Sequence, residues 1–532
     1  MVLHDSMTSN RPATWGSGTN PDPFPAARGK PAGRSDRRTR VLMELRPCFD
    51  GYAGIPQETR LLFGAFAASS DFLMGGLLNG AASNAGARAD TASDPALRVF
   101  SQAGHLIALD NGHTPASLLR RIGNRTIGSY TAERLSVLRR AREIDGLGTT
   151  LDPEVFGDWI WMRLMRLGLE PEQRALIERG KFIFPRMSWG DAARLATLNS
   201  RARTTLDMAA SGWDIHLAHT PSPYRLRGGK LVVRYHDAIP LLWPHTISHA
   251  WQHARSHYRM LKANIADGAW FVCTSEPVRD DLLRLFPKAE KRSIVIPTMS
   301  SGAFRPEPRP AAQIQSIIKR GRDAGASKLR ALPSAKTDSL PGASAKVDNQ
   351  PFIMAVSTLE PRKNYEMLMR AAAVAHRRRD GGFHLVMVAN PGWRSEREVA
   401  LLRQLVNENI VYHLSDVSTH DLRALYTAAH AVICPSRAEG FDLATVEAMA
   451  CGAPVFASDI PVHRWVCGDA VEYFDPYDED RLSNLISEVV SAPRKEGRLA
   501  DLADQGLRRA GLYAPSVLEP AWHNAMDQVA RA

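Results

Sequence analysis

Cysteine is scarce in this chain, with five residues among 532, at positions 48, 273, 434, 451 and 467. None of them forms a Cys-x-x-Cys pair or lies beside a histidine cluster, so the sequence favours neither a zinc site nor a disulfide framework. Isolated thiols of this kind are typical of reduced core residues. We therefore expect a cytoplasmic protein.

Long apolar runs are also missing. The most apolar window, residues 61–80, is interrupted by Asp71, two serines and several glycines, which predicts a helix followed by a buried strand and not a membrane span. The first 38 residues lack the apolar core of a secretory signal, so we expect no export. No Walker-type Gly-x-x-x-x-Gly-Lys motif is present, which disfavours an ATPase loop.

The positive charge is concentrated in two segments. The formal net charge is +11. Residues 1–40 hold seven Lys/Arg against three Asp, and residues 308–350 hold eight against three, so these two segments carry +9 of it. This distribution argues against nucleic-acid binding on a folded domain. It leaves open either plain solvation or a weak peripheral attraction to anionic lipid at the inner face of the cytoplasmic membrane.

Strand and helix patterns predict an α/β protein with two doubly wound, Rossmann-like domains facing a central cleft. We expect a disordered basic tail over 1–39, domains over 40–307 and 351–532, and a linker or insertion over 308–350. The last helix is expected to pack back on the N-terminal domain. Residues 85–205 show helical segments but no clear strand rhythm.

The stretch STLEPRKNYEMLMRA, residues 357–371, predicts an apolar strand, a tight loop and a helix beginning near Asn364. The loop places Arg362 and Lys363 beside the helix N-terminus, whose free N–H groups and dipole favour anions. Two cations there form a suitable grip for a diphosphate. The alternative is an ordinary cation pair on a solvated helix start.

The stretch SRAEGFDLATVEAMACGAPVFASD, residues 436–459, has the same construction. Glu439 lies in the predicted loop and Glu447 on the following helix, so both could face one ligand. Carboxylates accept hydrogen bonds from hydroxyls, which suits sugar and ribose recognition. Gly440 would let the loop backbone approach a ligand closely. The alternative is that both glutamates are solvated charges.

Together these two stretches resemble the retaining nucleotide-sugar glycosyltransferases of family 4, which have the two-Rossmann GT-B fold. The resemblance covers most of residues 350–480. It is weaker but supportive in ELRPCFDGYAGIPQETRLLFGAF, residues 44–66, which resembles the family's N-terminal glycine loop, and in RYHDAIPLLWP, residues 234–244, which resembles its His-Asp strand end.

The resemblance implies roles for residues of the C-terminal domain, which would bind the nucleotide sugar. Lys363, helped by Arg362, would bind the donor diphosphate and neutralise the leaving group. Glu439 would hold hydroxyls of the transferred sugar, and Glu447 the nucleotide ribose. Backbone amides of the loop Gly440, Phe441 and Asp442 would contact the donor.

The N-terminal domain would face the acceptor. Gly54 resembles the loop glycine that approaches donor and acceptor, and His236, followed by Asp237, would lie at the cleft near the sugar. We expect Glu439, Lys363 and His236 to form the catalytic set.

Two positions depart from the family pattern. Thr358 stands where many members carry an arginine five residues before the lysine, so we expect the phosphate grip to rest on Arg362 instead. Trp465 stands where relatives often have a glutamate, so we do not expect the contact that this glutamate makes.

These features predict a retaining hexosyltransferase that needs neither a cofactor nor a metal, because two cations supply the charge and no convincing Asp-x-Asp motif is present. The resemblance favours a GDP-linked sugar first and a UDP-linked sugar second, with transfer of mannose or rhamnose. The acceptor would be a glycan or lipid-linked oligosaccharide of surface polysaccharide or lipopolysaccharide synthesis. The alternatives are a sugar-nucleotide epimerase or phosphorylase of similar fold, or a non-catalytic module recruited to a membrane.

Overall fold

A computed structural model describes residues 38–51, 54–80, 94–111, 147–198, 203–331 and 350–532. The chain from Ser35 to Ala532 clusters into one compact unit. All but the last two residues of the tail predicted over 1–39 lie outside the described residues. Over the described ranges, no helix combines the length and the apolar character that a membrane crossing requires.

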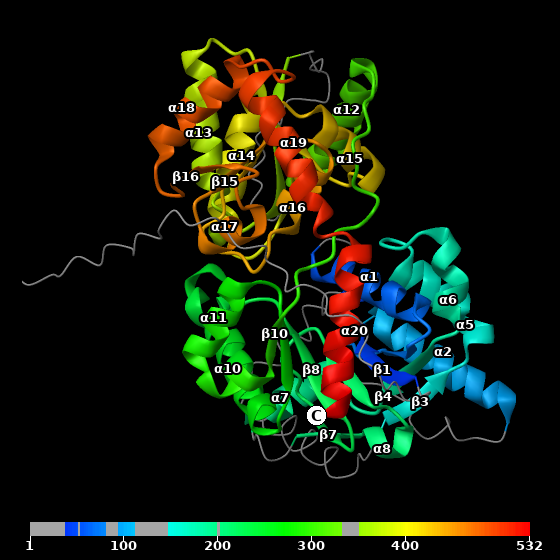
Figure 1. Cartoon of the computed structure of the whole chain (residues 1–532). Helices are drawn as coiled ribbons and strands as arrows, with labels where there is room; N and C mark the ends of the chain where they lie inside the picture. The colour runs from blue at the N-terminus through cyan, green and yellow to red at the C-terminus, as the bar shows by residue number, and fades with distance from the viewer. Residues whose placement is uncertain (1–37, 52–53, 81–93, 112–146, 199–202, 332–349) are drawn as a thin grey trace, which may run out of the picture. The chain divides into compact units, whose positions relative to one another are not determined.

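The first half of the chain builds an eight-stranded sheet in the order β10-β9-β8-β6-β1-β2-β4-β3 (Figure 1). All neighbours are parallel except β3, which runs antiparallel to β4 at the edge. The strands are β1 Thr39–Glu44, β2 Phe72–Leu77, β3 Leu147–Leu151, β4 Lys181–Pro185, β6 Ile215–Ala218, β8 Lys230–Tyr235, β9 Trp270–Cys273 and β10 Ser293–Val295. A separate short pair is formed by β5 Thr205–Asp207 and β7 Arg225–Arg227.

The second half builds a fully parallel six-stranded sheet in the order β13-β12-β11-β14-β15-β16. Its strands are mostly buried, as expected for a parallel sheet covered on both faces. They are β11 Phe352–Leu359, β12 His384–Pro391, β13 Val411–Leu414, β14 Ala431–Cys434, β15 Val455–Ser458 and β16 Glu472–Phe474. Two parallel sheets in sequence confirm the predicted α/β, two-Rossmann class.

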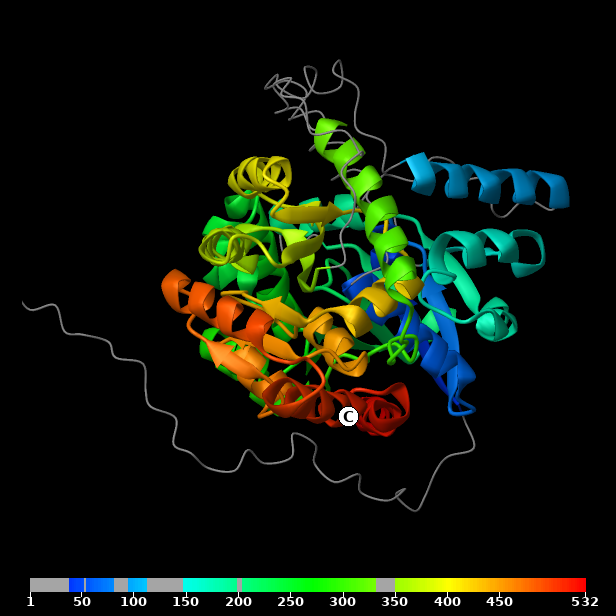
Figure 2. The same cartoon turned by 90° about the horizontal axis from the view of Figure 1, so that it is seen from above.

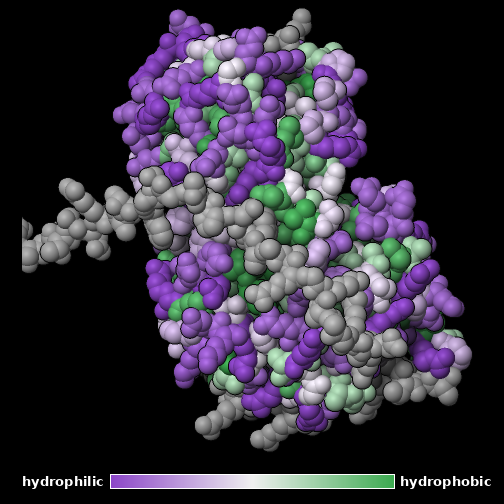
Figure 3. Space-filling model, in the orientation of Figure 1, coloured by the Kyte–Doolittle hydropathy of each residue, from purple (hydrophilic) through white to green (hydrophobic). Residues whose placement is uncertain are grey.

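The helices cover the sheets with their apolar faces. The face of the molecule in Figure 3 is mostly hydrophilic over α13, α18 and α19, whose Leu368, Ile486 and Leu499 are buried. In the first half the helices are α1 Ile55–Ala68, α2 Pro95–Asn111, α5 Pro153–Ile160, α6 Arg174–Glu178, α7 Trp189–Leu198, α8 Met208–Ser211, α9 Ile239–Leu242, α10 Ala250–Ala266 and α11 Glu276–Leu285. In the second half they are α12 Ala311–Ala331, α13 Tyr365–Arg378, α14 Glu396–Asn407, α15 Thr419–Ala428, α16 Leu443–Ala450, α17 Pro461–Cys467, α18 Glu479–Ser491, α19 Gly497–Gly511 and α20 Pro515–Arg531.

Helix α12 occupies part of the segment 308–350, where we expected a linker or insertion. Residues 311–331 form a helix that packs against β13 and α15, and it lies alongside the second sheet in Figures 1 and 2. Ile314, Ile317, Ile318 and Leu329 are buried at helical spacing. The segment is therefore a packed helix as far as Ala331, and the rest of the expected linker up to residue 349 lies outside the described residues.

Two strands within 85–205 were not anticipated. β4 adds to the sheet beside β2, and β3 closes its edge with an irregular register between Leu147 and Thr150. Their sequences, LGTTL and KFIFP, are short, and the first has little apolar character. Pairing with neighbouring strands of the sheet, and not local pattern, stabilises such strands.

The last helix, α20, lies against the first sheet although it follows α19 of the second half. It contacts α1, β1 and β8. Trp522 is fully buried and packs edge-on against Phe66 with ring centroids 5.8 Å apart, while the guanidinium of Arg234 lies 5.3 Å from its ring centroid. The C-terminal residues thus complete the core of the N-terminal half.

We expect Trp522→Ala to lower the free energy of unfolding by about 3–5 kcal/mol, because it opens a large cavity between α20 and the sheet. The measurement is equilibrium denaturation in urea or guanidinium chloride. Trp251→Ala is the matched control, since Trp251 is 75% exposed on α10 and its loss should change stability by about 0.5 kcal/mol or less. Equal effects of the two substitutions would contradict the packing of α20.

Candidate active site

The site lies where the carboxyl ends of two neighbouring strands meet. β11 and β14 are adjacent in the second sheet, so the loops that follow them lie side by side. The backbone N–H of Arg437 in one loop donates to the carbonyl of Arg362 in the other at 2.8 Å. In open α/β sheets ligands bind at such strand ends.

Glu439 binds both predicted cations. Its Oε1 accepts from Lys363 Nζ at 2.5 Å and from Ser436 Oγ at 2.6 Å, and its Oε2 accepts from Arg362 Nη1 at 2.9 Å. Only 5% of the Glu439 side chain and 11% of the Lys363 side chain are exposed. The structure therefore brings together three of the residues that the sequence pattern singled out.

The charges of this cluster balance one another. Burial alone would raise the pKa of Glu439, but the Lys363 and Arg362 cations outweigh it, so its pKa is lowered. Burial would likewise lower the pKa of Arg362, but the carboxylates of Glu439 and Glu360 reverse the shift, so its pKa is raised. Glu439 and Arg362 therefore stabilise each other's charged form in a largely water-excluded position.

The departure at Thr358 has a structural role. Thr358 Oγ1 donates to Glu360 Oε1 at 3.1 Å, and Glu360 Oε2 accepts from Arg362 Nε at 3.0 Å. Glu360 therefore fixes the guanidinium that points to Glu439. This arrangement is consistent with a phosphate grip that rests on Arg362, although the role itself stays a prediction.

The loop after Glu439 is held by a second buried acid. Asp442 has a left-handed backbone (φ 63°), and its Oδ2 accepts from Thr445 Oγ1 at 2.6 Å and lies 3.0 Å from His463 Nε2. Burial raises the pKa of Asp442, but the hydrogen bond from His463 and the Lys363 charge outweigh this, so the pKa is lowered. Phe441 packs edge-on against Tyr513 and also faces Trp465, the second departure from the family pattern.

Glu447 differs from Glu439 because, among the described residues, no cation pairs with it. It lies on α16, is 7% exposed, and accepts a long hydrogen bond, 3.5 Å, from the hydroxyl of Tyr426. Burial, reinforced by the negative charge of Asp442, raises the pKa of Glu447 to about 8. Glu447 is therefore mostly protonated at neutral pH, a state that the sequence did not reveal.

The Gly440 backbone contacts the first half of the chain. Its carbonyl accepts from Thr274 Oγ1 at 3.1 Å and Ser275 Oγ at 2.9 Å. A Cβ at this position would lie 2.0 Å from the His236 carbonyl oxygen and 3.3 Å from Asp237 Cβ. The expected close approach of this glycine is therefore made, in this structure, to the strand end that carries His236 and Asp237.

His236 faces a buried ion pair. Its Nδ1 lies 3.5 Å from Glu58 Oε2, while Glu58 Oε1 accepts from Arg234 Nε at 3.0 Å. Burial, with the nearby Arg234 charge, places the pKa of His236 well below its usual range, and its buried Nε2 has no hydrogen-bond partner. His236 is thus a neutral imidazole with one unused nitrogen.

Gly54 and Asp237 complete the predicted set. Gly54 begins α1, which carries Glu58, and its backbone (φ 66°, ψ −130°) is one that glycine alone adopts readily. Asp237 accepts from the N–H of Ile239 at 2.9 Å. Burial raises the pKa of Asp237, opposed by the charge of Arg362. The charge of Arg362 in the cation cluster therefore acts on Asp237, which belongs to the first half of the chain.

Several supporting residues were missed. Ser436 and Glu360 hold the Glu439 and Arg362 side chains, and His463 holds Asp442. Asn364 spans three loops, since its Nδ2 donates to the carbonyls of Pro435 at 3.0 Å and Pro476 at 2.8 Å. The signals were weak, because these are common polar residues whose partners are distant in sequence. Over the described part of the chain, no group of three or more His, Cys, Asp or Glu side chains is placed to hold a metal ion.

The two sheets define a protein of the two-Rossmann class, and the candidate site lies at the strand ends of the second sheet, against the first half of the chain. Sequence comparison then identifies the second half: residues 337–505 match the family model described as glycosyl transferases group 1. This part of the chain is therefore similar to the glycosyltransferases of that group. The match supports the expected enzyme class, and membership of family 4 in particular stays a prediction.

Several curated proteins are similar over part of their length. O-antigen chain mannosyltransferase B of Escherichia coli is 25% identical over 271 residues, which are 50% of this chain and 63% of that protein. O-antigen chain mannosyltransferase RfbU of Salmonella typhimurium is 29% identical over 28% of this chain and 41% of its own. MMP alpha-(1->4)-mannosyltransferase of Mycolicibacterium hassiacum is 33% identical over 30% and 38%. The matches thus span between about two fifths and three fifths of these relatives.

Solved structures confirm the GT-B fold. Sucrose-phosphate synthase from Thermosynechococcus elongatus superposes with a TM-score of 0.55 at 15% identity, over 92% of this chain and 99% of its own. Anabaena Alr3699/HepE, solved in complex with UDP and glucose, superposes with a TM-score of 0.50 at 14% identity, over 92% and 100%. At these identities the similarity establishes the fold alone.

We expect Gly440→Ala to lower stability by about 1–3 kcal/mol, because the new methyl group collides with backbone that cannot move aside as a side chain would. Thermal and denaturant unfolding measure the effect. Gly302→Ala is the control, since a Cβ there meets nothing within 4 Å. A Gly440→Ala protein as stable as the Gly302→Ala protein would show that the contact with His236 does not form.

We expect Glu447 to make stability depend on pH. Its pKa is about 8 in the folded protein against a reference of 4.5. Between these values the folded state keeps a proton that the unfolded state has lost. Stability therefore falls as pH rises through this window, by up to about 1.4 kcal/mol per pH unit, and levels off above about pH 8.

The measurement is the difference in unfolding free energy between the wild-type protein and Glu447→Gln from pH 5 to pH 9. Glutamine cannot ionise, so the wild type should lose stability relative to the variant as pH rises to 8. Parallel pH profiles would contradict the raised pKa.

Proposed function

We propose that this chain is a retaining, metal-independent hexosyltransferase that uses a nucleotide diphosphate sugar as donor. The observation that carries the proposal is the Glu439 cluster, in which Lys363 and Arg362 lie at the ends of adjacent parallel strands inside a glycosyl transferases group 1 domain. A buried pair of cations beside a sugar-binding carboxylate is what cleavage of a sugar-diphosphate bond requires.

The ion pairs of this cluster can be exchanged for others. Glu439 pairs with both cations, and this pairing offsets the cost of burying the three charges. A bound diphosphate would take over Lys363 and Arg362, and the freed carboxylate would accept hydrogen bonds from hydroxyls of the transferred sugar. Glu439 then positions the sugar and does not attack it.

Bond cleavage develops negative charge on the departing diphosphate and positive charge on the anomeric carbon. Lys363 and Arg362 would stabilise the first. In a front-face reaction the departing phosphate oxygen accepts the proton of the attacking hydroxyl, and configuration is retained. His236, neutral and with Nε2 free of partners, would offer a polar contact to the sugar from the first half of the chain.

Glu447 would bind the nucleotide ribose. Its carboxyl group is mostly protonated in the ligand-free protein, and ribose hydroxyls that donate to it would favour the ionised form. Nucleotide binding would then release a proton from Glu447. Backbone amides of residues 440–442 and Gly54 would contact the donor.

The mannosyltransferase relatives support a mannose-type sugar. Our first choice of donor stays a GDP-linked sugar, with a UDP-linked sugar as second choice. Two of those relatives act on O-antigen chains according to their names, which supports a glycan or lipid-linked oligosaccharide acceptor in surface polysaccharide or lipopolysaccharide synthesis. Peripheral contact of the basic segments with anionic lipid at the cytoplasmic face remains part of the proposal. An epimerase, a phosphorylase or a non-catalytic module is disfavoured by the family of the domain.

The test is a thermal-shift screen against GDP, UDP, ADP and their sugar conjugates, with EDTA present. A ligand that binds the folded state must raise the melting temperature. We expect one nucleotide to raise the melting temperature. Lys363→Ala should weaken the binding of that nucleotide by about 10- to 100-fold, because a charge-assisted contact is lost.

Lys495→Ala is the matched control, because Lys495 is an exposed lysine of the same half and its loss should leave the shift unchanged. A shift that depends on added metal would refute metal independence. No shift with any nucleotide or sugar conjugate would count against the proposed donor class.

A further inference from the structure

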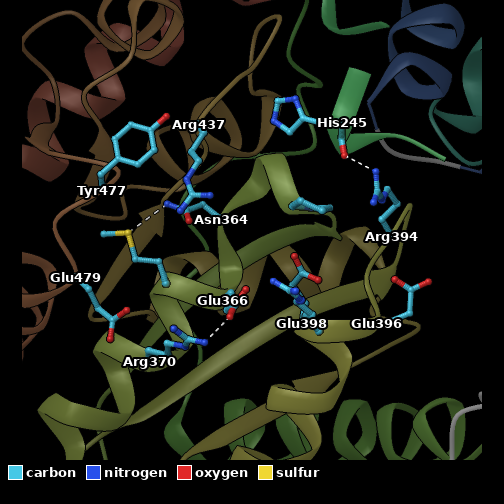
Figure 4. A pocket seen from close by; sticks show the side chains of 13 residues that line it. His245, Asn364, Glu366, Arg370, Arg394, Glu396, Glu398, Arg437, Tyr477 and Glu479 are labelled. Atoms are coloured by element: carbon cyan, nitrogen blue, oxygen red, sulfur yellow. Dashed lines mark hydrogen bonds and ion pairs between the residues drawn. The ribbon is translucent and has the colours of Figure 1, made fainter. Parts of the chain in front are cut away.

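A polar pocket borders the loop of residues 361–364, which carries Arg362 and Lys363. Its volume is about 550 Å³, within the usual range of ligand pockets, about 300–1,000 Å³. The first turns of α13, α14 and α18 line it, together with the loop around Arg437 and, from the first half of the chain, His245 (Figure 4). Neither Glu439 nor Glu447 is part of its lining, so the donor roles proposed above leave this pocket unused.

The lining carries charge of both signs in equal number. Four glutamates and four arginines face the pocket, which makes its formal charge zero apart from His245. An anionic ligand would meet the glutamates and a cationic ligand the arginines, so neither is favoured. A neutral ligand that both donates and accepts hydrogen bonds suits such a lining, and hydroxyl groups do both.

Two of these charged groups each have one buried atom without a hydrogen-bond partner among the described residues. Glu398 is only 4% exposed, and the atom is its Oε2. In Arg437 the atom is Nε. An unpartnered buried polar atom is costly, so these two atoms mark places where a ligand can supply a donor and an acceptor.

An exposed aromatic ring, that of Tyr477, lies beside Arg437. Tyr477 is 66% exposed, and the Arg437 guanidinium lies 5.1 Å from its ring centroid. Figure 4 shows both side chains at the same end of the pocket. A flat ring next to unpartnered polar groups offers an apolar surface for the C–H face of a sugar, while the polar groups take its hydroxyls.

The pocket adjoins the proposed reaction centre along the chain. Asn364 lines the pocket, and the preceding residue, Lys363, pairs with Glu439. The pocket also joins both halves of the protein, because Arg394 Nη1 donates to the carbonyl of His245 at 2.7 Å. A glycan held here would therefore contact the same loop that grips the donor.

We propose that this pocket binds a neutral carbohydrate chain, as an acceptor subsite built on the second half of the protein. The acceptor role rests on the proposed function, whereas binding of the glycan itself does not. Glu398 and Arg437 bind sugar hydroxyls, and Tyr477 stacks on a sugar ring.

Direct binding is the first arm of the test. Calorimetry of the full chain with α-mannotriose is compared among the wild type, Tyr477→Ala and Glu398→Met, which removes both carboxylate oxygens at similar volume. We expect at least a tenfold loss of affinity in each variant. Trp251→Ala, another exposed aromatic residue, should bind as the wild type does.

Inorganic phosphate and spermidine serve as anionic and cationic probes. Binding of either one at the pocket, abolished by the same substitutions, would overturn the assignment of a neutral ligand. Equal α-mannotriose affinity in all four proteins, or no α-mannotriose binding by the wild type, would also overturn it. Denaturant unfolding of Glu398→Met is measured alongside, so that a loss of binding can be distinguished from a loss of folding.

Donor binding is the second arm, and it separates this inference from the proposed function. We expect the nucleotide shift to be unchanged in Tyr477→Ala and Glu398→Met, and the KM for the acceptor to rise at least tenfold with the donor KM unaltered. Pocket-dependent glycan binding without any nucleotide shift would support the inference while refuting the transferase proposal. A rise in melting temperature with a nucleotide, together with an unaltered acceptor KM in both variants, would support the transferase proposal and refute the inference.

Discussion

The close approach of the Gly440 backbone to His236 is the constraint on which the arrangement of the site depends. It fixes the strand end of the first sheet against the loop that carries Glu439, and two hydroxyls, of Thr274 and Ser275, tie down the Gly440 carbonyl. Only a residue without Cβ permits this contact. Because the contact consists of backbone and small side chains, it can separate and re-form without repacking a core, as a protein that admits its ligand between two halves needs.

Charge balance explains why the buried ionic groups around this contact are tolerated. Glu439 has two cations, Asp442 has a histidine and a hydroxyl, and Arg234 has Glu58. Glu447 has no cation and keeps its proton instead. Each of these charged groups is therefore either paired or protonated. Under the proposed function, ligand binding would exchange ionic partners, so affinity would depend on the protonation state of Glu447 as well as on the shape of the site.

Much of the fold and part of the site could be predicted from the sequence. Strands β11 and β14 are uniform apolar runs with marked loop signals, so the positions of Lys363, Arg362 and Glu439 followed directly. Helix α12 was missed because its Ala, Ser and Lys composition is typical of a linker, although its isoleucines have helical spacing. The contact partner of Gly440 and the isolation of Glu447 depend on residues more than a hundred positions away, or on burial, and no local pattern encodes either.

The position of helix α20 at the end of the chain affects when the N-terminal half can complete its core. The first sheet is complete in sequence at Val295, yet the side chain that fills its surface, Trp522, is 227 residues further along. At a synthesis rate of about 5–20 residues per second, the first half must wait for about 10–50 s before its core can close. During that interval the faces of α1 and β8 that α20 will cover are open to water or to a chaperone. The N-terminal half is therefore synthesised first, but its core is completed only after α20 has been synthesised.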